Sequence, residues 1–311
     1  MDTNFTIRAA KATDRSEIAG LICASLNCWY VAHGGSAIFP GGPADADVFF
    51  DVYNALEPGN CVVAEDASNG RLAGSCFYHP RPTHVSLGIM NVHPDYFGQG
   101  IARRLLQFII DFTDNGGYPA LRLISSAGNL DSFSLYNRAG FFPRAVYQDM
   151  VLDVPASGLK HAVPGMNRIR TAVEGDAPRM VALERAVSGV ERGGDYAFCI
   201  RNQNGFWRAS VYQTDAGEIA GYMIASTHRA LNILGPSVAV SDEVAAALLL
   251  NELDHHRGRT PLFILPTDHP QLVQQAYSWG ARNVELHVCQ VRGAFQPFQG
   301  VVLPTFLLET A

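Results

Sequence analysis

Apolar positions recur along this chain with two alternating periods, which predicts strands and helices that interleave along the sequence. The alternation of Val85, Leu87 and Ile89 is clear on one strand. In the first half we expect strands at 5–10, 61–66, 71–79, 84–92, 120–126 and 144–153, and helices around 14–29, 45–56, 100–113 and 131–139. Hairpin-like spacing between residues 61 and 92 favours an α/β fold with a mixed sheet over an all-parallel one.

The second half repeats the opening of the first. IRAAKATDRSEIAGL from Ile7 returns as IRTAVEGDAPRMVAL from Ile169. Each copy predicts a short strand followed by an Asp that can cap a helix, and in the first copy Glu17 follows Asp14 at capping-box spacing. The chain therefore resembles a tandem duplication. Further elements of the second copy are expected as strands at 207–214, 218–227, 230–234 and 261–265, and helices at 241–256 and 270–279.

A segment without periodicity separates the two copies. DVPASGLKHAVPG, residues 153–165, is rich in Pro, Gly, Ser and Ala, which is typical of a linker. A length of 311 residues also suits two domains. We therefore predict a first domain at 1–153, a linker at 154–165 and a second domain at 166–311.

Composition narrows the functional classes. Hydrophobic residues make up 48% and charged residues 17%, and the formal net charge of −6 argues against a nucleic-acid partner, which needs a basic surface. The six cysteines show no C-x-x-C spacing, the start MDTNFTIRAA has no apolar signal region, and no apolar run reaches the roughly 20 residues of a membrane span. We therefore expect a cytoplasmic protein without a membrane partner. His255 and His256 follow the polar end of a helix and are expected to cap it, so no metal site is predicted.

The most informative segment is NVHPDYFGQGIA, residues 91–102, which leads into an apolar-periodic helix. It places a strand, a proline, a glycine-rich turn and a helix in immediate succession. Gly98 and Gly100 allow positive φ, which brings backbone N–H groups close to a ligand at the positive end of the helix. The loop is therefore predicted to bind a phosphorylated ligand.

Two familiar phosphate loops are excluded by their spacing. A P-loop needs Lys and Ser or Thr after its last glycine, and Gly100 is followed by Ile101 and Ala102. A dinucleotide fingerprint needs a third glycine, and Arg103 stands at that position.

The segment instead resembles the acetyl-CoA pyrophosphate loop of the GNAT superfamily of N-acetyltransferases. The shared residues are Val92, Pro94, Gly98, Gly100, Ile101, Ala102, Leu105 and Leu106. Phe97 departs from the family's usual Arg or Gln, which removes a side-chain donor but leaves the backbone cradle. A second GNAT motif follows at the expected separation and comprises Asn129, Leu135, Tyr136, Gly140 and Phe141, with Ser132 in place of a small Ala.

The resemblance implies two GNAT-like domains, each a mixed, mostly antiparallel sheet flanked by helices, with a splayed central strand pair. It implies acetyl-CoA as acyl donor, held by Met90, Asn91, Val92, Phe97, Gly98, Gln99, Gly100, Ile101, Ala102, Arg103, Asn129, Ser132 and Tyr136. Tyr136 is the candidate general acid for the departing thiolate. The general base stays open among Glu65, His84 and Asn91, with Glu65 carried forward.

The second copy retains the scaffold but lacks the glycine loop, since LGPSVAVSDEVAAALLL has no glycine between Pro236 and Gly258. We expect a degenerate GNAT-like domain there. The predicted function is transfer of an acetyl group to a primary amine of a small molecule or peptide. Two alternatives remain: a non-catalytic acyl-CoA-binding or regulatory module, and a transferase that uses a longer acyl-CoA or an oxygen acceptor. The acceptor is unknown, and the oligomeric state is open, with a homodimer among the candidates.

Overall fold

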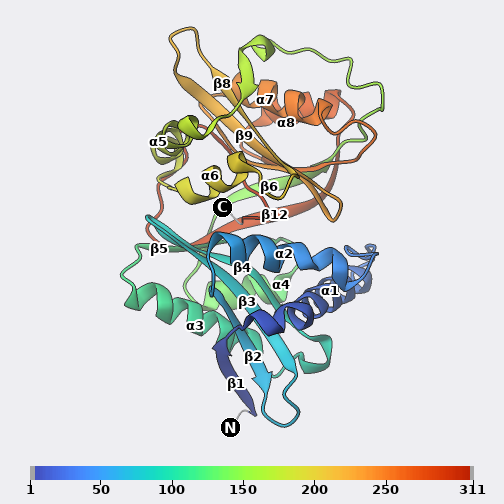
Figure 1. Ribbon diagram of the computed structural model, residues 1–311, viewed down its shortest axis with the longest axis vertical. Coiled ribbons are helices and arrows are strands. Elements are labelled where there is room, and N and C mark those ends of the chain that lie inside the picture. Colours follow the sequence, from blue (N-terminus) through green and yellow to red (C-terminus); the bar gives the residue numbers. More distant parts are fainter. Residues whose placement is uncertain (1–3, 309–311) are drawn as a thin grey trace. The chain divides into compact units, whose positions relative to one another are not determined.

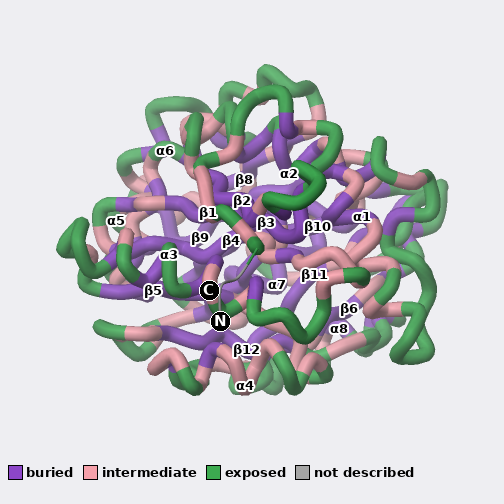
Figure 2. Tube along the Cα trace, turned by 90° about the horizontal axis from the view of Figure 1, so that it is seen from below, coloured by how far each residue is buried: buried purple, intermediate pink, exposed green. Residues whose placement is uncertain are grey.

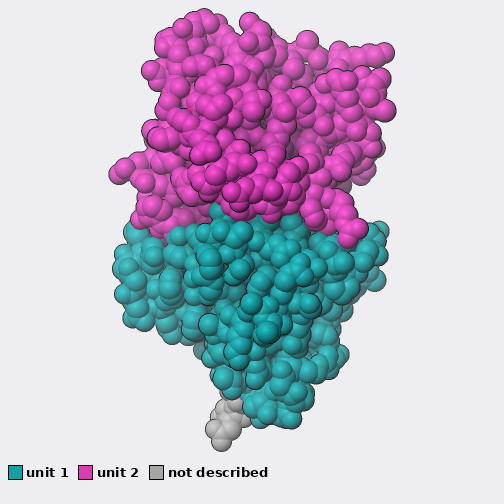
Figure 3. Space-filling model, viewed as in Figure 1, with its two compact units in different colours: residues 1–80, 85–121 teal, residues 81–84, 122–311 magenta. Residues whose placement is uncertain are grey.

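The computed structural model describes residues 4–308, and the chain divides into two compact units (Figure 1). Among the described residues, the first unit contains 4–80 and 85–121, and the second contains 81–84 and 122–308 (Figure 3). Part of the amino-terminal segment used above, residues 1–3, lies outside the described residues. The compact units are not the predicted domains 1–153 and 166–311, whose boundaries stay a prediction from the sequence repeat.

The first unit is built on four strands in the order β1-β2-β3-β4, and β1–β2 and β2–β3 pair antiparallel. The strands are β1 Phe5–Ala9, β2 Cys61–Asp66, β3 Leu72–Arg81 (up to Pro80 in this unit) and β4 His84–Val92 (from Val85 on). The helices are α1 Arg15–Ala32, α2 Pro43–Leu56 and α3 Ile101–Asn115, with short 3₁₀ turns at Ala12–Asp14 and Pro94–Tyr96. Strands β2 and β4 begin and end where the sequence pattern predicts.

The second unit contains a longer sheet in the order β5-β12-β6-β11-β10-β9-β8-β7, with β13 paired to β10. Its strands are β5 Ala120–Ser126 (from Arg122 on), β6 Phe142–Val151, β7 Ile169–Thr171, β8 Trp207–Gln213, β9 Ile219–His228, β10 Leu231–Ala239, β11 Leu262–Pro266, β12 Arg282–Gly293 and β13 Val301–Leu303. Its helices are α4 Leu130–Arg138, α5 Ala177–Ser188, α6 Gly193–Arg201, α7 Asp242–Asp254 and α8 Pro270–Ser278, with 3₁₀ turns at Met166–Arg168 and Glu174–Asp176. The mixed, mostly antiparallel sheets flanked by helices confirm the predicted fold class.

The two sequence copies exchange strands within this sheet. β6 comes from the first copy, yet it pairs antiparallel with β11 on one side and β12 on the other, and both of these come from the second copy. β12 in turn lies between β6 and β5 of the first copy. The second copy therefore supplies an interior strand to the first, which the sequence analysis did not anticipate.

The duplicated opening makes the same hydrogen bonds in both copies, and we call this arrangement of Arg8 with Asp14, and of Arg170 with Asp176, the duplicated corner. Arg8 donates to Asp14 in the first copy at 2.6 Å, and Arg170 donates to Asp176 in the second at 2.6 Å. Each Asp also accepts a backbone N–H three residues before it, at 2.8 Å and 2.9 Å. Two corners with the same bonds support the predicted tandem duplication.

The side-chain capping expected of the Asp in each copy was wrong, since neither Asp14 nor Asp176 caps its helix through its side chain. Asp14 makes no side-chain cap to α1, because its carboxylate accepts from Arg8 and from the backbone N–H of Lys11. Glu17 does not complete a capping box either, since it accepts the Leu72 N–H at 2.7 Å. Both carboxylates tie the first turn to neighbouring segments instead.

The strands and α7 carry most of the core, while the turns are exposed (Figure 2). α7 is almost entirely buried, with Ala245, Leu248 and Leu249 at 0% exposure. Across residues 4–308, no helix is long and apolar enough to cross a membrane.

Candidate active site

The predicted phosphate loop has the backbone conformation, with positive φ at both glycines, that the sequence predicts. β4 ends at Val92, a single 3₁₀ turn follows, and α3 begins at Ile101. Gly98 has φ +76° and Gly100 has φ +77°, a region that residues with a Cβ rarely adopt. A Cβ built on either glycine would meet no atom within 4 Å, so the loop faces open space. Backbone with these dihedral angles and open space can form the anion-binding turn that the sequence predicts.

The amino end of α3 keeps its backbone donors available. Its N-cap is Gly100, which offers no side chain to accept them, and its first turn contains no acidic residue. The helix dipole therefore presents positive charge at the loop without a competing carboxylate. Arg103 in the first turn is exposed, as is Phe97 before the loop, at 53%.

A close helix–strand contact positions this end of α3. Gly74 on β3 has no side chain, and a Cβ there would lie 2.8 Å from Ile101 Cγ2 and 2.9 Å from the Asn91 carbonyl oxygen. Both distances are too short for real contacts, so Gly74 allows α3 to approach the sheet. Ile101 and Leu105 fill that contact at 1% and 0% exposure.

Asn91, on β4 just before the loop, has an unsatisfied side chain. The residue is 2% exposed, and neither Asn91 Oδ1 nor Nδ2 has a hydrogen-bond partner among the described residues. Leaving such a group unpaired costs about 1–3 kcal/mol. Its neighbours Met90 and Val92 are partly exposed. A polar ligand along this end of β4 would satisfy the amide, as the cofactor assignment of Met90, Asn91 and Val92 requires.

The second motif lies in the second unit and forms a capped helix. Asn129 is the N-cap of α4, and its Oδ1 accepts the Ser132 N–H at 3.0 Å. Tyr136 is 6% exposed and packs against Phe141 with ring centroids 5.8 Å apart. These contacts give Asn129 and Ser132 a structural role, and the cofactor and acid roles of the motif stay predictions.

Glu65, the base carried forward from the sequence, is bound in the duplicated corner. Arg8 Nε donates to Glu65 at 2.7 Å. In the second copy Arg170 Nε donates to the neutral Gln213 at 2.9 Å in the same position. A neutral amide thus takes the same position in the second copy, so the corner gives Glu65 a structural role, and its catalytic role stays a prediction. Of the other base candidates, Asn91 is described above, and His84 is 2% exposed with its Nδ1 3.1 Å from Thr83 Oγ1.

In the second copy, the helix that corresponds to α3 is α7, and its first turn is capped by a side chain of the chain itself. Ser241 caps α7 by accepting the Val244 N–H, and Asp242 and Glu243 stand in its first turn. A hydrogen bond from Ser241 lowers the pKa of Glu243, which keeps this carboxylate ionised. Negative charge and a self-capped end oppose phosphate binding.

In the second copy, β13 also opposes the binding of an extended ligand along β10. β10 pairs with β11 only at Ile233 and Leu234 and then pairs antiparallel with β13 from Ser237 to Ala239. Val301 and Leu303 are buried there at 0% and 1%. The chain's own strand thus occupies the edge along which an extended ligand would have to add.

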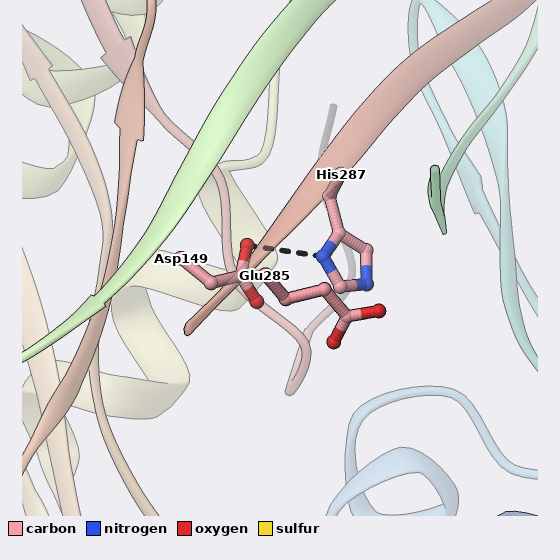
Figure 4. A group of neighbouring side chains, drawn as sticks. All are labelled: Asp149, Glu285 and His287. Atoms are coloured by element: carbon pink, nitrogen blue, oxygen red, sulfur yellow. Dashed lines mark hydrogen bonds and ion pairs between the residues drawn. The ribbon is translucent and has the colours of Figure 1, made fainter. Parts of the chain in front are cut away.

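Sequence reasoning missed a polar cluster on the exchanged strands. Asp149 on β6 stands opposite Glu285 on β12, and His287 follows two residues later (Figure 4). His287 Nδ1 lies at hydrogen-bond distance, 3.0 Å, from Asp149 Oδ1, and one nitrogen or oxygen atom from each of the three side chains lies within 4.8 Å of the other two. Asp149 and His287 are 138 positions apart and belong to different copies. No local spacing could have joined them, and β12 itself was not predicted.

Comparisons with known proteins agree with this fold. Residues 22–141 match the family model "Acetyltransferase (GNAT) family", and residues 180–298 match "Acetyltransferase (GNAT) domain". Together the two matches cover well over half of the chain. The chain belongs to the GNAT superfamily and contains two GNAT domains in tandem, and this family uses an acyl-CoA donor.

Individual relatives are distant. A Pyrococcus horikoshii protein of known structure superposes with a TM-score of 0.74 at 16% identity, covering 97% of this chain and 95% of that one. A tandem GNAT protein from the clavulanic acid biosynthesis pathway gives 0.58 at 16% identity, covering 93% and 98%. The UPF0157 protein YqkA of Bacillus subtilis (strain 168) is 36% identical over 73 residues, 24% of this chain and 21% of its own length. The chain thus spans about a fifth of that curated relative.

Proposed function

We propose that this GNAT protein transfers an acetyl group from acetyl-CoA to a primary amine of a small molecule or peptide by direct attack on the thioester. The observation that carries the proposal is the uncapped start of α3, preceded by Gly98 and Gly100 at positive φ and by the unsatisfied amide of Asn91. These groups suit an extended ligand that carries both phosphates and polar amides, as acetyl-CoA does.

Three groups of the predicted residues have a chemical task in this reaction. Backbone N–H groups from Gly98 to Arg103 hold the pyrophosphate. Backbone groups of Met90 and Val92, with the Asn91 side chain, hold the pantetheine arm, and one such N–H polarises the thioester carbonyl and stabilises the oxyanion. Tyr136 gives its phenolic proton to the departing thiolate.

One donor site per chain is proposed. The self-capped start of α7 and the pairing of β13 with β10 both oppose a second one. The second copy then serves as scaffold, which fits the strand that it contributes beside β5.

The test is a screen for CoA release with the full-length protein. Amino acids, polyamines, aminoglycosides and short peptides are offered with acetyl-CoA, and the products are identified by mass spectrometry. Competition among acyl-CoA chain lengths examines the acetyl preference. Release of CoA with an N-acetylated product supports the proposal. Tight acetyl-CoA binding without release for any acceptor would favour the non-catalytic module, and a faster reaction with longer chains would favour the other transferase.

A further inference from the structure

We propose that Asp149, Glu285 and His287 form a binding site for a divalent transition-metal ion of the zinc type, held between the last strand of the first sequence copy and β12 of the second. All three residues belong to the second unit, and their strands β6 and β12 pair directly. The site lies within one unit, and it does not depend on the proposed acetyl transfer.

The register of the two strands brings the three side chains together. Asp149 stands directly opposite Glu285, and Tyr147, two residues before Asp149, stands opposite His287. Because residues two apart on a strand share a face, both carboxylates and the imidazole lie on one face of the β6–β12 pair. The register shifts between Asn283 and Glu285, so β12 carries a bulge just before the cluster. Bulges re-aim side chains, and this one ends where Glu285 faces Asp149.

The donor atoms lie close to the spacing of metal ligands. His287 Nδ1 is 3.0 Å from Asp149 Oδ1, and one nitrogen or oxygen atom of each side chain lies within 4.8 Å of the other two. Zinc holds nitrogen and carboxylate oxygen at about 2.0–2.2 Å, so two ligands of a tetrahedral ion stand about 3.3 Å apart. A shift of roughly 0.3 Å therefore admits an ion between Asp149 and His287, in place of the hydrogen-bonding proton. The Glu285 carboxylate lies beside the imidazole, where rotation of its side chain brings it to the ion (Figure 4).

The charges of the cluster favour a cation. The two carboxylates are directly opposed across the strand pair, and like charges in opposed positions are destabilising. Burial raises the pKa of the Asp149 carboxyl, the hydrogen bond with His287 lowers it, and the Glu285 carboxylate raises it. A proton on the imidazole neutralises only one of the two carboxylates, whereas a divalent ion neutralises both.

Neighbouring side chains support the ligands and leave the cluster open at one residue. Ser126 of β5 donates a hydrogen bond to Glu285, and Phe306 packs beside the imidazole with ring centroids 4.7 Å apart. Contacts of this kind orient metal ligands and limit the access of water. His287 is 6% exposed, whereas Glu285 is half-buried, so the cluster reaches solvent at Glu285.

The donor set selects the kind of ion. Imidazole nitrogen suits zinc and its neighbours in the first transition row, whereas magnesium and calcium prefer oxygen donors alone. Three protein ligands leave the fourth tetrahedral position to water, as in open zinc sites. Zinc is therefore expected to bind more tightly than magnesium or calcium and to tie β6 of the first copy to β12 of the second.

The experiment measures zinc binding to the full-length protein, freed of metal by a chelator and carrying no histidine tag. Isothermal titration calorimetry should find one zinc ion per chain, with weak competition from magnesium or calcium. Removal of a ligand in His287→Gln or Glu285→Gln should weaken binding by about 10- to 100-fold or more, since loss of even a supporting partner has an effect of that size. Zinc at a hundredfold excess over its Kd should also raise the melting temperature of wild type by about 4 °C or more.

Two further variants separate the site from its surroundings. Ser126→Ala removes only a supporting hydrogen bond and should weaken zinc binding less than either ligand variant does. The matched control is His269→Gln. His269 Nδ1 lies 2.6 Å from Asp242 Oδ1 in another His–Asp pair of the second unit, and this variant should bind zinc as wild type does. Circular dichroism of each metal-free variant verifies that it is folded.

A wild-type protein that binds no zinc in the micromolar range would overturn the site. So would zinc affinities within about threefold of wild type in both His287→Gln and Glu285→Gln, a threshold well below the 10-fold loss expected. An equal loss in His269→Gln would place the ion at the other His–Asp pair, and tighter binding of magnesium or calcium would contradict the proposed class of ion. These results are independent of acetyl transfer, which the CoA-release screen tests separately.

Discussion

Replacing Gly100 by Val examines the phosphate cradle directly. At φ +77° a residue with a Cβ pays roughly 1–2 kcal/mol of backbone strain. That strain is present in both the free and the bound protein, so by itself it leaves the affinity unchanged. The new side chain, however, projects into the open space where the pyrophosphate is proposed to lie. We expect acetyl-CoA binding to weaken tenfold or more, about 1.4 kcal/mol.

The matched control is Gly117→Val, just after α3. Gly117 has φ +68°, and a Cβ there also meets nothing within 4 Å, so the two variants carry comparable strain in comparable space. Both should lower the melting temperature by a similar amount. Isothermal titration calorimetry with acetyl-CoA then separates strain from contact. If folded Gly100→Val binds acetyl-CoA as tightly as Gly117→Val does, the loop is an ordinary strand-to-helix turn and the assignment fails.

Four further predictions follow from the same contacts. Tyr136→Phe keeps the packing against Phe141 and should lower kcat by about 10²- to 10⁴-fold while acetyl-CoA affinity stays the same. If the variant keeps more than about half of the wild-type kcat while the chemical step limits the rate, Tyr136 has only a packing role. Glu65→Gln should stay active in the CoA-release assay, because Gln213 does the same work in the second copy, and a loss above tenfold would make Glu65 the base. Calorimetry should find one acetyl-CoA per chain, and two would refute the occlusion by β13. The hydrogen bond from Arg170 lowers the pKa of Asp176. Ionised Asp176 therefore stabilises the fold at pH values above the ordinary aspartate pKa, and this stability is lost as the pH falls through the lowered pKa. The free energy of unfolding in urea should differ most between Asp176→Asn and wild type near neutral pH, and a difference that grows in acid would contradict this.

The sequence pattern predicted correctly those elements whose formation depends on residues that are close together in the sequence. The strand at 84–92, the turn at Gly98–Gly100 and the helix after it all follow from residue spacing within a dozen positions. α6 was missed because it begins with Gly193 and Gly194, poor helix formers. Beside it, the buried ion pair of Arg192 with Glu184, which also accepts from Tyr196 of α6, supplies tertiary contacts that outweigh propensity.

The candidate site shows the same difference between contacts that are local in sequence and contacts that are not. The phosphate loop is a contiguous motif, so its glycines and the following helix could be read directly. The pairing of β6 with β12 joins residues more than a hundred positions apart, and its register alone brings Asp149 beside His287. Nothing near either residue indicates the other. The role of Glu65 was equally hidden, because its partner Arg8 lies 57 positions away.

The exchanged strand also governs how freely the two copies can change during evolution. Because β12 pairs with β6, substitutions within residues 282–293 act on the working copy as well as on the copy that encodes them. The start of α7, by contrast, can drift as long as the helix stays capped. A saturation mutagenesis screen for acetyl transfer should therefore find strong selection on β12 of the second copy and weak selection on the start of its α7. Gene fission between the copies would separate a strand from the sheet that it completes, so the two halves should be inherited as one reading frame.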